Sequence, residues 1–262
     1  MDDGTPLASL SLTHVHYNPA DRISYVCAWL ALVPQGLCVV YATLLWSSRE
    51  AEIGLMFAGQ LACEALNWLL KRYIKEERPR QMNGKGYGMP SSHAQFVAFF
   101  AVSLALFLLL RHNPPPHHQP ASTSASTPSD HTPPQPNDND HDVPWAAPLY
   151  QHAHTPLTLP LRAALSLAGL AAAALVALSR IYLNYHTPRQ VLVGFGTGVA
   201  FACVWFAATA WARRAGWVEW GLDTWPARAL RLRDLVVEED LVEAGWVRWE
   251  GRRRERRARK GR

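Results

Sequence analysis

Two polar stretches decide how this chain folds: KRYIKEERPRQMNGKGYGMPSSH at residues 71–93, and SRIYLNYHTPRQ at residues 179–190. Each follows an apolar run, at the point where a membrane helix would reach water. Between them they hold a cluster of cations, two histidines and several small hydroxyls. Such side chains suit the binding and cleavage of a phosphate group at a membrane surface.

Five apolar runs surround these stretches, and a helix of about 20 such residues crosses a bilayer. Pro34 is expected to kink the first run, which membrane helices tolerate. We therefore predict an all-α fold, a polytopic membrane helix bundle with about five transmembrane helices. The runs cover residues 24–46, 53–70, 94–110, 163–178 and 191–212.

The average composition conceals these runs. The 262 residues are 49% hydrophobic and 18% charged, and mean hydropathy is only −0.09 because a polar insert and a charged tail dilute the apolar runs. The net charge is +5 and the pI is about 9.2. The cations lie in the tail and the two polar stretches, next to the predicted bilayer. We therefore expect membrane lipids as partners, and no nucleic acid.

Several polar or reactive residues lie inside the apolar runs. Glu64 and Asn67 are three residues apart, on one helical face. Glu64 is either functional, as ionisable groups in membrane helices often are, or part of a hydrogen bond between helices. Four cysteines have no metal-binding spacing and are expected to be buried as small hydrophobes: Cys27, Cys38, Cys63 and Cys203.

The remaining segments set the domain boundaries. We predict a lumenal N-terminal segment at 1–22, without a removable signal peptide, a membrane domain at 23–212, and a basic cytosolic tail at 213–262. Residues 112–160 are rich in Pro, Ser, Thr, His, Asn and Asp, and form a disordered cytosolic insert by composition. The insert holds seven of the eleven histidines, but their irregular spacing argues against a metal site.

The tail mixes Trp, Arg and acidic residues and ends in GRRRERRARKGR. Its apolar positions are expected to lie along the membrane interface as an amphipathic segment. Two interpretations of the terminal basic run stay open: it binds anionic lipid, or it only sets the orientation of the chain.

The order of the runs brings the two polar stretches to the same side of the membrane. The chain leaves that side in the third run and returns in the fourth, so the second stretch emerges where the first does. The opposite ends of the runs carry basic residues, which indicates that those ends face the cytosol. These residues are Arg49, Arg111, Arg162, Arg213 and Arg214. The polar stretches are then expected to face a lumen or the exterior.

Lys71 and Arg78 are seven residues apart, which on a helix places them about two turns apart on nearly the same face. Pro79 disfavours helical backbone at Arg78, so the helix is expected to end there. The pair suits an anion site. Taken alone, however, it fits snorkelling at a membrane boundary better.

The third run is expected to open with Ser92 as N-cap and Gln95 as its capping-box partner. The free N–H groups and the dipole at such a helix start bind anions. His93, in the first turn, can then reach a bound phosphate. The alternative is a cap beside an interfacial histidine.

The second stretch adds Arg180 as a third cation, and His186 just before a helix. That helix is expected to start at Thr187 as N-cap, with Pro188 at N1 and Gln190 at N3. Gln190 has two candidate roles that can coexist. It completes a capping box with Thr187, or its amide oxygen accepts a hydrogen bond from the His186 ring.

Three motifs in this order resemble the signatures of the type 2 phosphatidic acid phosphatase superfamily. They are K-x6-RP at Lys71, Arg78 and Pro79, PS-x-H at Pro90, Ser91 and His93, and SR-x5-H at Ser179, Arg180 and His186. Four segments resemble the sequences of the dolichyldiphosphatase branch: residues 86–96, residues 179–187, the N-terminal residues 8–17 and the pair Arg233–Asp234. The resemblance does not cover residues 112–160.

The resemblance implies His186 as a nucleophile that forms a phosphohistidine, and His93 as the general acid. Gln190 is counted with this catalytic pair. No metal or other cofactor is implied. Carried over by motif position, the residues that bind the phosphoryl oxygens are Lys71, Arg78, Ser91 and Arg180, and Ser92 is counted with them as substrate-binding.

Two positions depart from the broad superfamily: Ser92 stands where it has Gly, and Gln190 stands where it has the Asp that orients the nucleophile. The dolichyldiphosphatase branch shares both. A neutral Gln190 should polarise His186 less than a carboxylate would. We hypothesise that a diphosphate substrate tolerates this, because its leaving group is a phosphate whose second pKa is about 6.

The implied function is hydrolysis of dolichyl diphosphate, a polyisoprenoid diphosphate, to dolichyl phosphate and phosphate. The expected place is the lumenal side of the endoplasmic reticulum membrane, where the reaction recycles the lipid carrier of protein N-glycosylation. One alternative is a broad-specificity lipid phosphate phosphatase, which Gln190 disfavours. Another is a non-catalytic lipid-phosphate-binding membrane protein, which the intact His93 and His186 disfavour. The sequence leaves the oligomeric state open.

Overall fold

The computed structural model describes residues 8–10, 15–79, 86–112, 157–237 and 241–260. The predicted disorder of the 112–160 insert falls, apart from the ends of that segment, outside these residues. The chain divides into two compact units. One holds the described residues up to 112 and 158–234. The other contains α9 (Leu241–Lys260), a helix that is described by itself.

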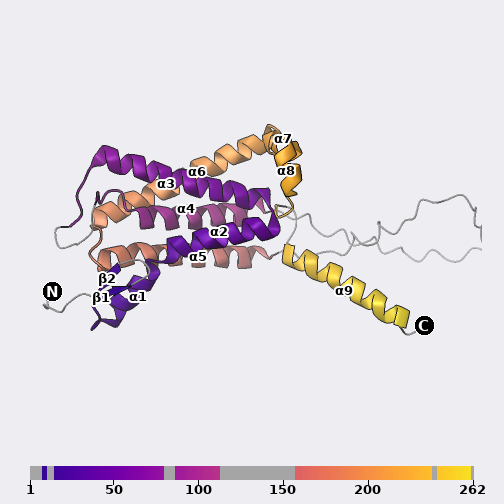
Figure 1. Cartoon of the computed structure of the whole chain (residues 1–262), viewed down its shortest axis with the longest axis horizontal. Coiled ribbons are helices and arrows are strands. Elements are labelled where there is room, and N and C mark those ends of the chain that lie inside the picture. Colours follow the sequence, from indigo (N-terminus) through magenta and orange to yellow (C-terminus); the bar gives the residue numbers. More distant parts are fainter. Residues whose placement is uncertain (1–7, 11–14, 80–85, 113–156, 238–240, 261–262) are drawn as a thin grey trace, which may run out of the picture. The chain divides into compact units, whose positions relative to one another are not determined.

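Five helical segments are long and apolar enough to cross a membrane, which confirms the predicted all-α membrane bundle. The protein is a multi-pass membrane protein. Figure 1 shows the long helices lying alongside one another. The first span is divided into α1 (Arg22–Leu30) and α2 (Val33–Ser48). The others are α3 (Ala51–Ile74), α4 (Ser92–Leu106) with its π-helical continuation η1 (Phe107–Arg111), α5 (Leu159–Tyr182) and α6 (Pro188–Arg214).

Pro34 interrupts the first span, as its sequence predicts. A proline ring clashes with the carbonyl four residues earlier, which here is that of Leu30, the last residue of α1. Pro34 itself lies in the first turn of α2, where a missing N–H breaks no helical hydrogen bond. Because of this break, the Ala31 carbonyl does not take part in the regular main-chain hydrogen bonds of a helix.

A short β-hairpin precedes the bundle and was not predicted. Strands β1 (Ala8–Leu10) and β2 (Val15–Tyr17) pair antiparallel. Buried Val15 packs in a cluster that includes Leu183 and Tyr185. The His16 N–H donates to the Tyr185 hydroxyl at 2.8 Å. The hairpin is therefore fastened to the turn that follows α5.

Helix α4 is the most buried of the five spans and packs against both α5 and α6. Its Phe96, Val97 and Ala101 meet residues of α5 in one cluster. Its Phe99 packs with Cys63 and Ala202 in another. The stretch at 91–93, which begins this helix, therefore rests on the best-packed element of the protein.

Two of the four cysteines contradict the expectation of burial. Cys27 and Cys63 are buried, whereas Cys38 is half-buried and Cys203 is exposed. Lipid tails are as apolar as a protein interior. An apolar run therefore does not distinguish the side of a helix that faces its neighbours from the side that faces lipid.

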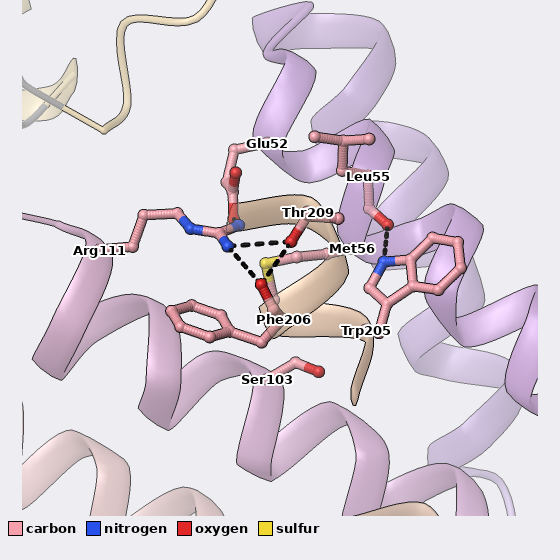
Figure 2. Close-up of a pocket in the computed structure, with 8 residues that line it drawn as sticks. All are labelled: Glu52, Leu55, Met56, Ser103, Arg111, Trp205, Phe206 and Thr209. Carbon is pink, nitrogen blue, oxygen red and sulfur yellow. Dashed lines mark hydrogen bonds and ion pairs between the residues drawn. The ribbon is translucent and has the colours of Figure 1, made fainter. Parts of the chain in front are cut away.

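At the end of the bundle away from the hairpin, a network of charges ties three helices together. Glu52 of α3 accepts from Arg111 Nη1 at 2.6 Å and from Arg213 Nη2 at 2.5 Å, and its side chain is only 2% exposed. Arg213 also pairs with Asp234. Figure 2 shows the Arg111 guanidinium between Glu52 and the Thr209 hydroxyl, to which it donates at 2.9 Å.

Two short helices lie at the same end of the bundle (Figure 1): α7 (Trp217–Asp223) and α8 (Trp225–Leu230). They expose Trp217, Trp220 and Trp225. Indole side chains are enriched where a membrane meets water. The predicted interfacial position of this part of the tail stays a prediction.

Replacing Glu52 with alanine should destabilise the protein, because it leaves two buried guanidinium groups without their shared carboxylate. Removing one partner of a buried ion pair costs about 3–5 kcal/mol. The measurement is thermal unfolding of the purified protein in detergent. Asp223→Ala is the control, since Asp223 pairs with Arg228 while both side chains are mostly exposed, and such pairs contribute about 0–1 kcal/mol. Equal, small shifts in both variants would contradict this account.

Candidate active site

The end of α3 differs from the prediction. The helix stops at Ile74, and Lys75 adopts a left-handed conformation with φ of 53°. Arg78 is therefore not on the helix, and the predicted shared face with Lys71 is wrong. The chain turns away early because Glu76 is held elsewhere: its carbonyl accepts from the Gly88 N–H at 2.7 Å.

The start of α4 also differs by one residue. Ser91, not Ser92, is the N-cap, and its side chain makes no capping hydrogen bond. The predicted capping box with Gln95 is absent, because the Gln95 side chain is used between helices. It donates to the Cys63 carbonyl at 2.8 Å and accepts from Asn67 at 2.7 Å. Asn67 thus makes a hydrogen bond between α3 and α4, which was suggested for Glu64 and not for Asn67.

Two glycines of α6 bring the start of α4 against the start of α6. A Cβ atom on Gly194 would lie 2.5 Å from the Ser91 carbonyl oxygen, and one on Gly198 would lie 2.3 Å from the Gln95 carbonyl oxygen. The Ser91 N–H donates to the Gln190 carbonyl at 3.1 Å. Gly194 and Gly198 form a GxxxG pattern, which is typical of close helix contact in membranes, and the contact joins the stretch at 91–93 to the stretch at 186–190.

His93 lies in the first turn of α4, as expected. Its Nε2 is 3.1 Å from the Ala31 carbonyl oxygen, at the break between α1 and α2. A carbonyl can only accept, so Nε2 carries the proton of this hydrogen bond. Nδ1 is then the ring atom left for chemistry. Sequence reasoning missed Ala31, although Pro34 indicated the break that frees its carbonyl.

A cavity of about 250 Å³ opens beside His93, between α2, α3 and α4. Its lining combines apolar and polar side chains: Pro34, Gln35, Cys38, Glu64, Ser92, His93 and Phe96. The Glu64 Oε1 atom is buried and has no hydrogen-bond partner among the described residues. The hydrogen bond suggested for Glu64 is therefore not seen, and the residue lines the cavity.

Arg180 lies at the end of α5 and is only 3% exposed. Its guanidinium stacks over the Tyr185 ring at 4.3 Å. Its Nε and Nη1 atoms have no hydrogen-bond partner within the described part of the chain, and the same is true of Arg78 Nε and Ser91 Oγ. Buried donors are nearly always paired in proteins. Donors left over in this way are suited to an anionic ligand.

The start of α6 follows the prediction. Thr187 is the N-cap, Pro188 is in the first turn, and Gln190 completes a capping box with Thr187. Gln190 Oε1 also lies 3.3 Å from His186 Nδ1. Both roles proposed for Gln190 therefore coexist. Since Oε1 can only accept, His186 Nδ1 carries the proton, and Nε2 keeps its lone pair.

The environment of His186 favours the neutral imidazole. The residue is 3% exposed. Burial and the charges of Arg78, Arg180 and Lys71 lower its pKa from 6.5 to about 3, although the Gln190 hydrogen bond opposes this shift. A neutral ring is the form that can act as a nucleophile.

The predicted site residues come together. Lys71, Arg78 and Arg180 are near enough to act on His186, and the charges of Lys71, Arg180 and His186 also act on His93. Lys71 Nζ lies 3.5 Å from Ser92 Oγ. The three motifs thus converge at one end of the bundle. Sequence reasoning missed two further contributors, Tyr185 and Glu76, since nothing in their immediate sequence marks them.

The sequence of the membrane domain matches a known protein family. Residues 52–214 match the PAP2 superfamily model. The chain therefore belongs to the PAP2 superfamily, and it is a phosphatase, a hydrolase embedded in the membrane.

Its relatives place it within the dolichyldiphosphatase branch. The chain is 53% identical to a Neurospora crassa protein named "Putative dolichyldiphosphatase", over 98% of this chain and 96% of the relative. It is 37% identical to Dolichyldiphosphatase 1 of Homo sapiens, over 76% of this chain and 71% of the human protein. It is 30% identical to Dolichyldiphosphatase 1 of Dictyostelium discoideum, over 77% and 72% respectively. No solved structure matches the chain significantly.

The contact between α4 and α6 can be tested with two alanine substitutions. Gly194→Ala should lower turnover at least 100-fold, because its Cβ would meet the Ser91 main chain and push the start of α4 away from His186. Gly196→Ala is the matched control on the same helix, since nothing lies within 4 Å of a Cβ there. Phosphate release by the two folded variants is compared. Equal activities would show that the close contact is not needed.

The lowered pKa of His186 predicts how stability depends on pH. The unfolded chain binds a proton at His186 near pH 6.5, whereas the folded protein binds it only near pH 3. Stability is therefore lost as pH falls from 6.5 towards 3, at a slope of up to about 1.4 kcal/mol per pH unit. The check is thermal unfolding in phosphate-free detergent at pH 7 and pH 5. His186→Gln should lose less stability than the wild type, and an equal loss would refute the assignment.

Proposed function

We propose that this protein hydrolyses dolichyl diphosphate to dolichyl phosphate and phosphate, through a phosphohistidine on His186. The observation that carries the proposal is that His93 and His186 lie near three cations, Lys71, Arg78 and Arg180. These cations form no salt bridge among the described residues. The substrate comes from the names of the relatives.

In the first step, His186 Nε2 attacks the terminal phosphorus of the diphosphate. The bond from that phosphorus to the bridging oxygen breaks, and the leaving group is the lipid monophosphate. His93 Nδ1 gives its proton to the bridging oxygen, while the Ala31 carbonyl supports the charged ring beforehand. Lys71, Arg78 and Arg180 stabilise the negative charge on the transferring group.

In the second step, water replaces the lipid phosphate. His93 Nδ1, now neutral, takes a proton from the water as its oxygen attacks phosphorus. The phosphorus–nitrogen bond breaks, which returns His186 to its neutral form and releases inorganic phosphate. Both histidines end the cycle as they began it.

The nature of the leaving group supports a diphosphate over a lipid monoester. Gln190 offers His186 an amide oxygen rather than a carboxylate, so the nucleophile is less strongly activated. A phosphate leaving group demands less activation than an alkoxide, since its second pKa is about 6. The cavity beside His93 offers room for the part of the lipid next to its phosphate.

The proposed place is the endoplasmic reticulum membrane, with the site on the lumenal side and the product returning to the lipid-carrier pool of protein N-glycosylation. Support for the orientation is the basic residues at the other end of the bundle. Arg49, Arg111, Arg162 and Arg213 lie at the ends of spans there.

A substrate panel tests this function. Purified protein in detergent micelles is given dolichyl diphosphate, dolichyl phosphate or phosphatidate, and released phosphate is measured. We expect the diphosphate to be cleaved at least 100-fold faster than either monoester, and His186→Ala to lose at least 1000-fold. Comparable rates on phosphatidate would support the broad-specificity alternative. Unchanged release by His186→Ala would exclude the mechanism.

A further inference from the structure

The orientation of the Gln190 amide is fixed by four groups. Its Oε1 faces two donors, His186 Nδ1 at 3.3 Å and the Thr187 N–H at 3.2 Å. Its Nε2 faces two acceptors, the Glu76 carboxylate at 3.0 Å and the Glu77 carbonyl at 2.9 Å. Turning the amide over would set donor against donor at the Thr187 N–H and acceptor against acceptor at Glu76 and Glu77, whose roles are fixed whatever the His186 tautomer. The oxygen must therefore face His186.

Glu76 is well placed to maintain this arrangement. It follows directly on the end of α3 and is half-buried. Its main-chain carbonyl accepts from the Gly88 N–H at 2.7 Å. Gly88 in turn packs on the Gln190 amide so closely that a Cβ there would lie 2.8 Å from Nε2. The segment after α3 thus closes over Gln190 on the side away from His186.

The charge of Glu76 matters because the charged groups that act on His186 are cationic. Arg78, Arg180 and Lys71 all disfavour positive charge on His186. Positive charge nevertheless develops on this ring as Nε2 bonds to phosphorus. Gln190 itself is neutral and contributes only a dipole. A carboxylate hydrogen-bonded to the far end of that dipole polarises the amide and opposes the cations.

We propose that Glu76 is a positioning residue for the nucleophile. Its carboxylate holds the Gln190 amide with its oxygen towards His186. Through this amide it also supplies a negative charge, which the stretch at 179–190 lacks. The inference rests on the proposed phosphohistidine mechanism. It assigns a chemical role to a residue between the Lys71 and Arg78 of the first motif. The row His186–Gln190–Glu76 is then the functional equivalent of a histidine–carboxylate pair.

The test begins with Glu76→Gln, which keeps an acceptor for the Gln190 amide but removes the charge. Residues that orient metal-binding histidines by hydrogen bonds typically change activity 10- to 100-fold when replaced, and we expect Glu76 to act on a similar scale. We expect kcat, and the single-turnover rate of phosphoenzyme formation, to fall about 10- to 100-fold. KM should stay within about threefold, because Glu76 contacts no substrate. Glu77→Gln is the matched control. It removes the same charge from the neighbouring residue, whose side chain is exposed, and it leaves the Glu77 main-chain carbonyl in place.

A charge swap separates this role from a merely structural one. Gln190→Glu alone should be impaired, because its new carboxylate oxygen would face the Glu76 carboxylate at about the present 3.0 Å. Adding Glu76→Gln should then raise kcat at least tenfold over that single variant, although the same substitution is harmful in the wild type. This reversal of sign is the expected result.

The outcomes are distinguishable. If the wild type forms no phosphoenzyme on His186, the proposed mechanism fails, and the role of Glu76 fails with it. If the phosphoenzyme forms but Glu76→Gln leaves its rate unchanged, only the inference about Glu76 is overturned. It is also overturned if Glu76→Gln fails to improve the Gln190→Glu variant, whose stability is checked by thermal unfolding.

Discussion

The close approach of α4 and α6 is the constraint on which the site depends. Hydrophobic burial does not drive helices together in lipid, so small residues and main-chain contacts decide which helices meet closely. Here the Ser91 main chain lies so close to Gly194 that there is no room for a Cβ methyl group between them. The Ser91 N–H then reaches the Gln190 carbonyl directly. Packing that involves neither His93 nor His186 thus brings together two stretches about 90 residues apart in sequence, from which we propose that one anion site is built.

The same residue type has opposite roles at the two ends of the bundle. Arg111 and Arg213 share the buried carboxylate of Glu52, and Arg213 also pairs with Asp234, so two carboxylates balance the two cations and the network ties helices together. Arg180 at the other end is more deeply buried, at 3% exposed; its guanidinium stacks on the Tyr185 ring, and its Nε and Nη1 atoms have no hydrogen-bond partner among the described residues. Burying an unmatched charge is costly. This cost is the reason why we propose that the cationic end of the bundle binds a phosphate group.

The sequence predicts those features of the fold and the site that depend on residues close together along the chain. The five spans, the break at Pro34 and the cap at Thr187 follow from nearby residues, and the structure agrees with them. The end of α3 and the N-cap of α4 were misplaced because tertiary hydrogen bonds won over local signals: Glu76 is held by Gly88, and Gln95 by Asn67. The β-hairpin and the supporting carbonyl behind His93 depend on partners far away in sequence. The motif residues were found, whereas the groups that orient them required coordinates.

The most direct measurement of the central claim is an experimental structure of the full chain with orthovanadate, which mimics the phosphoryl group in transfer. The account predicts vanadium bonded to His186 Nε2, with its oxygens held both by Arg180 and by the start of α4 at Ser91–His93. Vanadate bound away from His186, or held by the 179–190 stretch with no contact from α4, would contradict the claim that helix packing assembles one site from two distant stretches.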